Sequence, residues 1–196
     1  MNADITALVE RIRTLENELE TEFAKRREAL RYRIVNRRAV FEQDVIRRHR
    51  ELKATLLRYF LEARPLAILT APVIYALIVP FALLDLCVTA YQAICFPVYG
   101  IAKARRGDFF VFDRHRLAYL NAVEKLNCVY CSYGNGVIAY VREVASRTEQ
   151  YWCPIKHAQR LRAAHERYHR FVDYGDAEAY RHHLDSLRKD LMPPPP

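Results

Sequence analysis

The most restrictive feature of this sequence is a long apolar run near its middle. Residues 66–102, LAILTAPVIYALIVPFALLDLCVTAYQAICFPVYGIA, contain a single charged residue, Asp85. As one straight helix the run would be about 55 Å long, well beyond the roughly 30 Å hydrocarbon core of a bilayer. A helix on the surface of a soluble protein has a polar face, and this run shows none. The run therefore predicts a membrane-embedded segment that bends or folds back.

Asp85 divides the run into two uncharged stretches, residues 66–84 and 86–102, each near the minimum length for one crossing. The bends would come from the prolines of the run, Pro72, Pro80 and Pro97. We therefore expect residues 65–104 to form a transmembrane or re-entrant helical hairpin with Asp85 at its tip.

Both flanks of the run are basic. The residues concerned are Arg58 and Arg64 before it, and Lys103, Arg105 and Arg106 after it. By the positive-inside rule both ends of the hairpin then face the cytoplasm, which predicts a cytoplasmic (inner) membrane with both termini cytoplasmic. Two alternatives remain open: a hairpin buried in the core of a soluble protein, and one kinked crossing that would place the C-terminal cysteines in an oxidising space.

Residues 4–64, within the first expected division of the chain (residues 1–64), predict one long, coiled-coil-like helix. They contain no Gly or Pro, and their apolar residues recur at helical spacing. The early positions step by three and four, as in a left-handed coiled coil: Ile5, Leu8, Ile12, Leu15 and Leu19. Such a helix needs a partner along its length. We expect either self-association with a second copy or docking of another protein's helix.

The chain is basic, with 31 Lys and Arg against 23 Asp and Glu, and a formal net charge of +8. A basic surface favours polyanions, either anionic lipid headgroups or nucleic acid. Much of the excess lies in residues 25–64, which lead directly into the apolar run. Basic residues beside a membrane segment are expected from topology alone, so the pattern predicts a membrane with anionic headgroups as partner and disfavours nucleic acid.

Residues 105–196 predict a small C-terminal helical module with a Pro-rich tail over residues 192–196. The expected helices cover residues 115–126 and 137–150, with a turn at the YGNG of residues 133–136 between them. A further helix should begin at Pro154, and a last one after Gly175 and Asp176. The chain is thus expected to be all-α, with divisions at residues 1–64, 65–104 and 105–196.

Four residues of this module match a metal-ligand set. Cys128, Cys131, Cys153 and His157 have the spacing C-x2-C-x21-C-x3-H. Three thiolates and one imidazole form a closed tetrahedral site for structural zinc, which would brace a module with little apolar core. Iron or an iron–sulfur cluster is the alternative metal for this set. Cysteines buried as small apolar residues are the alternative without a metal.

A second candidate site is HERYH, residues 165–169, a literal match to the H-E-x-x-H of zinc metalloproteases. His165 and His169 would be ligands and Glu166 the general base. The charged Arg167 and the lack of a following third ligand at a recognised spacing weaken this reading. The nearby candidates for that third ligand are Glu178, His182 and His183.

The sequence therefore favours a non-enzymatic, membrane-anchored scaffold or adaptor with a structural zinc site in its cytoplasmic C-terminal module. Two alternatives remain open. One is a membrane-bound zinc metallopeptidase that uses HERYH, and the other is a membrane redox protein that binds iron at the Cys3His site.

Overall fold

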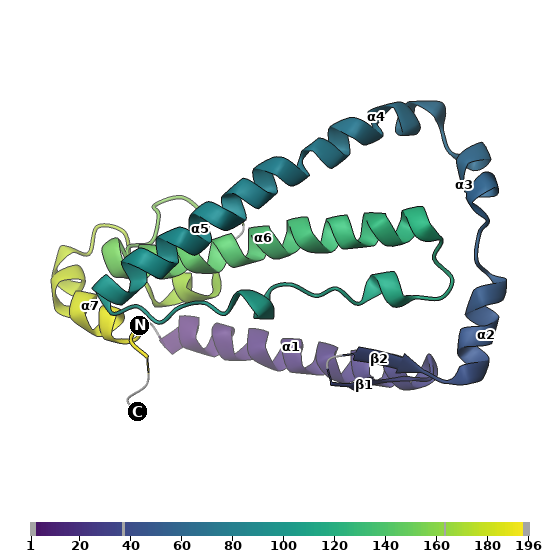
Figure 1. The fold of residues 1–196 in the computed structure, drawn as a ribbon. Helices are drawn as coiled ribbons and strands as arrows, with labels where there is room; N and C mark the ends of the chain where they lie inside the picture. Colours follow the sequence, from purple (N-terminus) through teal and green to yellow (C-terminus); the bar gives the residue numbers. More distant parts are fainter. Residues whose placement is uncertain (1–2, 37, 163, 194–196) are drawn as a thin grey trace. The chain divides into compact units, whose positions relative to one another are not determined.

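The computed structural model describes residues 3–36, 38–162 and 164–193, and it is mostly helical (Figure 1). The end of the expected Pro-rich tail, residues 194–196, lies outside the described residues. The chain divides into two compact units. The first unit comprises Met1–Ala63 and Asp113–Cys128, and the second comprises Arg64–Phe112 and Val129–Pro196.

The expected single helix over residues 4–64 is wrong, because a β-hairpin and two loops interrupt it. The elements of this stretch are α1 (Ala3–Ala29), β1 (Tyr32–Val35), β2 (Arg38–Phe41), α2 (Gln43–Glu51) and α3 (Leu56–Glu62). The strands pair antiparallel, with Tyr32 opposite Phe41 and Val35 opposite Arg38. The apolar stripe of α1 faces solvent along most of its length, so the coiled coil stays a prediction. Its exposed members are Leu8, Ile12, Leu15 and Leu19.

Local chemistry explains why α1 stops without a glycine or proline. Arg31 and Asn36 have positive φ values of 54° and 50°, and Asn36, at the hairpin turn, is a residue type that tolerates this conformation well. The strands are rich in β-branched and aromatic residues, which favour extended structure. The guanidinium of Arg31 then donates to Glu42 and to Asp44, 2.5 Å from Oδ2, and so ties the helix end to the far side of the hairpin.

The apolar run forms one helical segment, Pro65–Tyr99, made of α4 (Pro65–Ala76) and α5 (Ile78–Tyr99). The expected hairpin with Asp85 at its tip is absent: Asp85 lies inside α5 and is buried. The break at Leu77 fits Pro80, which has no N–H to donate to the carbonyl of Ala76. Pro72 and Pro97 lie inside helices that continue through them.

In the C-terminal region one long helix, α6 (Ala122–Trp152), replaces the two expected helices and the turn between them. The expected helix at Pro154 is also absent, and Ile155 forms a parallel β-bridge with Val172 instead. Short 3-10 turns cover Arg106–Asp108, Arg114–Arg116 and Glu166–Arg170. The last helix, α7 (Ala177–Lys189), agrees with expectation, and the side chain of Asp176 caps it by accepting from the Ala179 N–H.

The glycines that predicted a turn instead allow close packing along α6. A Cβ at Gly136 would lie 2.8 Å from the Phe110 ring and 3.0 Å from the carbonyl oxygen of Phe109. A Cβ at Gly134 would lie 3.1 Å from the Phe81 ring. These glycines let α5 and the segment after it approach α6 closely.

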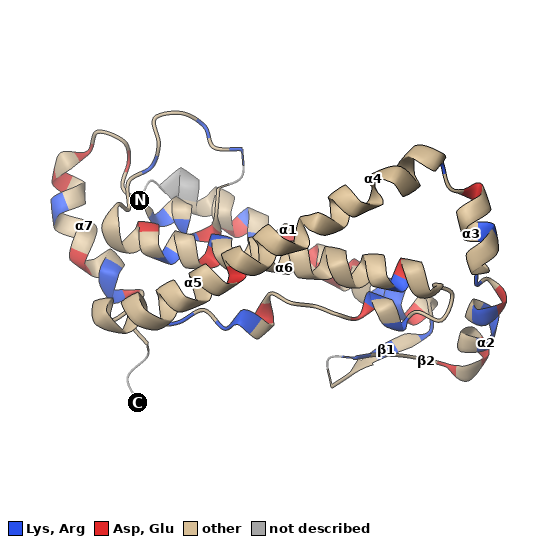
Figure 2. Cartoon of the chain, turned by 45° about the horizontal axis from the view of Figure 1, so that its top comes forward, with Lys and Arg blue, Asp and Glu red and all other residues tan. Residues whose placement is uncertain are grey.

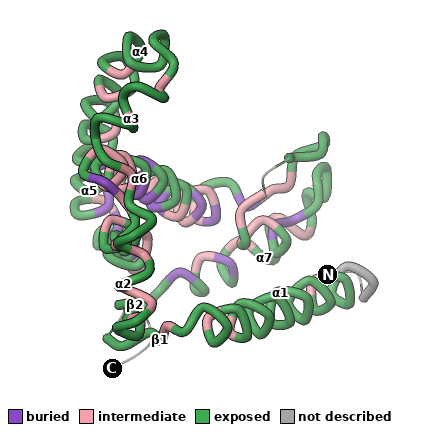
Figure 3. The backbone as a smooth tube through the Cα atoms, turned by 90° about the vertical axis from the view of Figure 1, so that its right-hand side faces the viewer, coloured by how far each residue is buried: buried purple, intermediate pink, exposed green. Residues whose placement is uncertain are grey.

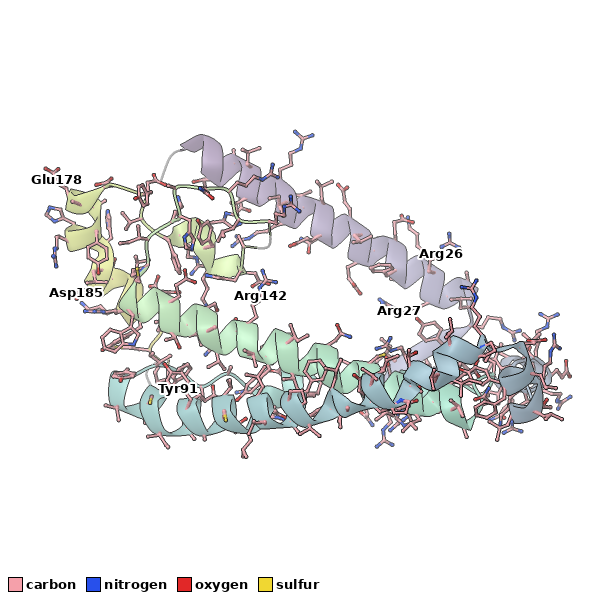
Figure 4. The ribbon with its side chains drawn as sticks, turned by 90° about the horizontal axis from the view of Figure 1, so that it is seen from above. Arg26, Arg27, Tyr91, Arg142, Glu178 and Asp185 are labelled. Atoms are coloured by element: carbon pink, nitrogen blue, oxygen red, sulfur yellow. The ribbon has the colours of Figure 1, made fainter. Side chains whose placement is uncertain are left out.

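The core of the second unit lies where α5, the segment after it, α6 and the C-terminal end meet. Figure 3 shows buried residues along α5 and α6, whereas α1 and α4 are mostly exposed. The buried cluster comprises Phe96, Ile101, Ala104, Tyr140, Val144 and Leu191. Tyr91, labelled in Figure 4, adds a hydrogen bond across the two helices, 3.0 Å from its hydroxyl to that of Thr148.

Candidate functional site

The apolar segment has two differently packed halves, a proximal half (residues 66–84) and a distal half (residues 85–99). The distal half contains buried polar residues, and Asp85 is the first of them, only 7% exposed. Arg106 donates to both carboxylate oxygens of Asp85, from Nε to Oδ1 at 2.9 Å and from Nη2 to Oδ2 at 2.6 Å. Tyr133 of α6 donates to Oδ2 at 3.1 Å. We call Asp85, Arg106 and Tyr133 the Asp85 cluster.

The Asp85 cluster neutralises a carboxylate that would otherwise be unpaired inside an apolar helix. Both Asp85 oxygens have donors, and the bidentate arrangement is the strong geometry for an Arg–carboxylate pair. Arg106 also lies 4.0 Å from the centre of the Phe110 ring, a cation–π distance. Burial, together with the hydrogen bond to Asp85, raises the pKa of Tyr133, so its hydroxyl stays protonated as a donor. Buried polar groups that have hydrogen-bond partners in this way are typical of a structural role, here holding α5 against α6.

Two helical turns further along α5, Gln92 binds the main chain of the segment that follows. The Ala104 N–H donates to Gln92 Oε1 at 2.8 Å, and Gln92 Nε2 donates to the Ala104 carbonyl at 3.2 Å. The same Nε2 donates to the Tyr140 hydroxyl at 2.6 Å. Gln92 is 6% exposed, so these bonds satisfy polar groups that water does not reach. We call this arrangement the Gln92 clamp.

In the proximal half, by contrast, none of the residues 66–84 is buried. The helical segment Pro65–Tyr99 has a mean hydropathy of 2.3 in its most apolar stretch, and none of that stretch is buried. Figure 2 shows α4 and the start of α5 with almost no charged residues. The proximal half contacts α6 through a 2.7 Å hydrogen bond from the Tyr130 hydroxyl to the Ile74 carbonyl and through the Tyr75 and Tyr130 rings, 5.7 Å apart. Within the described part of the chain, one helical segment, Pro65–Tyr99, is therefore long and apolar enough to span a membrane.

The four expected metal ligands do not converge. Cys131 lies on α6 and Cys153 directly follows the end of the same helix, so the rise of the helix separates them by roughly 33 Å. His157 instead donates its backbone N–H to the Tyr168 hydroxyl at 2.6 Å, and its ring stacks on Tyr168. Over residues 3–36, 38–162 and 164–193, no group of three or more His, Cys, Asp or Glu residues is arranged to hold a metal. Zinc or iron at Cys128, Cys131, Cys153 and His157 stays a prediction.

HERYH does not form the α-helical turn that an H-E-x-x-H zinc site uses. Residues 166–170 form a 3-10 turn, in which residues four apart do not align as they do on an α-helix. His165 Nε2 lies 2.8 Å from Glu149 Oε2, whereas Glu166 and His169 are exposed. The candidate third ligands Glu178, His182 and His183 are also exposed, on α7.

Arg167, the charged residue inside HERYH, has a structural partner. Its Nη2 donates to Glu143 Oε1 at 2.8 Å, and Arg147 donates to the same oxygen at 2.7 Å. Burial raises the pKa of Glu143, but the hydrogen bonds from Arg167 and Arg147 more than offset it and hold the pKa below its usual value. These contacts brace the 3-10 turn against α6.

Sequence reasoning missed the groups that hold the distal half. In the sequence Gln92 is one polar residue within the apolar run, and Arg106 resembles an ordinary basic flank of a membrane segment. A usable signal was present, because Asp85, Gln92 and Phe96 recur at helical spacing and so mark one face of α5.

The chain was also compared with known proteins. No family model, curated protein or solved structure matches it.

Proposed function

We propose that this protein is a non-enzymatic, membrane-anchored scaffold whose anchor is the α4–α5 segment, lying along one face of a bilayer. The observation that carries the proposal is the exposure of the most apolar stretch of the chain. A core helix of a soluble protein would be mostly buried. Exposed apolar surface on this scale needs another apolar phase to cover it, and a bilayer supplies one.

The buried stripe of the segment supports an orientation in the plane of the membrane. Asp85, Gln92 and Phe96 all face the protein, while the opposite side of α5 presents exposed apolar residues. These exposed residues include Leu83, Leu86, Ile94 and Val98. In this orientation the polar face stays with its protein partners, and only the apolar side meets lipid.

Chain length argues against a complete crossing by residues 66–84. Such a crossing would place the Asp85–Arg106 pair at the far surface, whereas residues 113–128 belong to the same compact unit as residues 1–63. From Arg106 to Asp113 the chain can extend by at most about 25 Å, less than the roughly 30 Å hydrocarbon core. An in-plane anchor keeps both flanks on one side. The basic flanks favour the cytoplasmic side and anionic headgroups.

The scaffold part of the proposal rests on α1. Leu8, Ile12, Leu15 and Leu19 are each at least half exposed, at the three–four spacing of a coiled coil. This stripe supports self-association, or docking of a partner helix, next to the membrane.

Two arginines on the lipid side of α4 test the anchor. Leu69 and Val73 are 74% and 70% exposed, so Leu69→Arg with Val73→Arg should leave the protein fold intact. Each arginine costs up to about 3 kcal/mol in hydrocarbon. We expect the doubly substituted protein to lose most of its co-flotation with phosphatidylcholine vesicles.

The matched control places the same charges on equally exposed leucines of α3. Leu57 and Leu61 are 72% and 76% exposed and precede the apolar run. Leu57→Arg with Leu61→Arg should float like the wild type. Wild-type protein that stays with the soluble fraction, or equal loss in both variants, would rule out α4 as the anchor.

A further inference from the structure

The first unit contains a pocket that is independent of the membrane anchor. It has a volume of about 590 Å³ and lies between β2, α2 and the 113–128 segment. This is the size range of pockets for small organic ligands. Four basic side chains line it: Arg50, Lys53, Arg116 and Lys125.

The described residues that line the pocket include no Asp or Glu. The nearby acids already have other partners. Glu42 and Asp44 both accept from Arg31, which holds the pKa of Asp44 below its usual range. Glu124 accepts from the Asn121 N–H at 2.7 Å and so completes the N-terminal cap of α6. Among the residues that the structure describes, no acidic side chain forms an ion pair with Arg50, Lys53, Arg116 or Lys125.

Aromatic contacts hold the pocket walls together. The His49 ring of α2 meets Phe41 of β2 edge-on at 5.2 Å and Tyr119 of the 113–128 segment at 5.1 Å. These contacts link the elements that carry the four basic residues. A pocket already formed loses less conformational entropy when a ligand binds.

The rest of the lining is apolar and includes Val40, Phe41 and Ile46. A bare inorganic anion would use the basic side chains but would leave this surface and most of the volume unfilled. Guanidinium groups match the oxygens of phosphate, and a dianion suits a group of four cations.

We propose that this pocket binds a phosphate ester, with its phosphate among the four basic side chains and its organic part against the apolar wall. The ester could belong to a soluble metabolite or to a phospholipid headgroup, and the chemistry of recognition is the same. The site does not depend on whether α4–α5 is the membrane anchor.

Calorimetric titration of the full chain in detergent with phenyl phosphate tests the soluble source. Arg116→Gln with Lys125→Gln should weaken binding by roughly tenfold or more, since bonds to charged groups are lost. Arg50→Gln with Lys53→Gln repeats the test from the α2 side. The control pair, Arg33→Gln with Arg47→Gln, removes the same charge from exposed positions outside the pocket and should change binding less than about twofold.

A vesicle arm tests the lipid source. Preference for phosphatidylcholine vesicles containing phosphatidic acid over pure phosphatidylcholine vesicles should fall in the pocket pairs and persist in the control pair. If the pocket pairs lose the preference for phosphatidic acid and the wild type does not bind phenyl phosphate, the ligand is a lipid headgroup. If the wild type binds phenyl phosphate, the ligand is a soluble ester. The proposal is overturned if the wild type shows neither response, or if the control pair weakens both as much as the pocket pairs do.

Discussion

The two halves of the apolar segment are alike in composition but differ in what surrounds them. The distal half carries Asp85 and Gln92 on one face. Both side chains are buried, and both form hydrogen bonds to neighbouring elements. The proximal half carries neither a charged nor an amide side chain, and none of its residues is buried. Hydrophobicity alone therefore does not decide what covers a helix.

A few polar residues account for the different packing of the two halves. A buried carboxylate or amide is stable only with its partners in place, so Asp85 and Gln92 fix the rotation of α5 against α6 and the following segment. The proximal half carries no charged or amide side chain, although its Tyr75 ring contacts Tyr130 and its Phe81 ring lies against Gly134 of α6. Most of its surface is exposed and available to lipid, whereas the distal half can meet lipid only on the face away from α6.

The strongest test of the difference between the two halves is to place charge on the outer face of the distal half. Ile94 and Val98 are 70% and 77% exposed on α5. If the segment lies in the plane of the membrane, Ile94→Arg with Val98→Arg should reduce vesicle flotation to much the same extent as the α4 arginines, at up to about 3 kcal/mol per arginine. Flotation on phosphatidylcholine vesicles measures this directly.

If residues 66–84 instead crossed the bilayer and the distal half lay outside it, the same pair would float normally. That result would overturn the in-plane orientation while leaving α4 as the anchor. The unfolding midpoint in detergent is the control for folding, because both side chains point away from the core and their replacement should leave it nearly unchanged.

A smaller effect should distinguish the halves by folding rather than by lipid contact. Asp85→Ala leaves Arg106 and the Tyr133 hydroxyl without their acceptor, and about 1–3 kcal/mol of stability should be lost. We expect the lower part of this range, because the Arg106 side chain is 45% exposed and keeps access to water. The single tryptophan, Trp152, packs at 5.3 Å from Tyr99 and reports unfolding at the end of α5 by its fluorescence.

Leu69→Ala is the matching change in the proximal half. Because Leu69 is exposed, the same fluorescence transition in detergent should move by less than about 0.5 kcal/mol. Equal shifts for the two substitutions would mean that the Asp85 cluster does not hold the distal half in place.

The sequence predicted the broad features that depend on composition and missed those that depend on tertiary partners. The helical character, the long apolar segment and the α7 helix follow from hydropathy and periodicity. The β-hairpin after α1 was missed because Arg31 and Asn36 adopt positive φ without a glycine. Asp85 was assigned to a hairpin tip because its partner, Arg106, is distant in sequence and looked like a membrane flank.

The glycines of α6 show the same limit of sequence reasoning. In sequence, Gly134 and Gly136 suggested a turn, because two glycines within a short polar stretch are typical of loops. In the structure they lie inside a continuous helix and allow aromatic rings to approach it. Only the position of those rings reveals this role.

A further effect of about 1 kcal/mol is expected at the boundary between the halves. Gly134 faces Phe81 at the end of the proximal half, whereas Gly136 faces Phe110 and the Phe109 carbonyl, next to the Asp85 cluster. Gly134→Ala should be neutral or stabilising by up to about 1 kcal/mol, because alanine favours a helix and the edge of the Phe81 ring can shift slightly. Gly136→Ala should destabilise by about 1 kcal/mol, since overpacking against a main-chain oxygen outweighs that helix preference. Thermal unfolding of both variants, followed by Trp152 fluorescence, measures the difference. Equal stability would mean that the chain around Phe110 yields as readily as Phe81 does, and that the distal half is held no more rigidly than the proximal half.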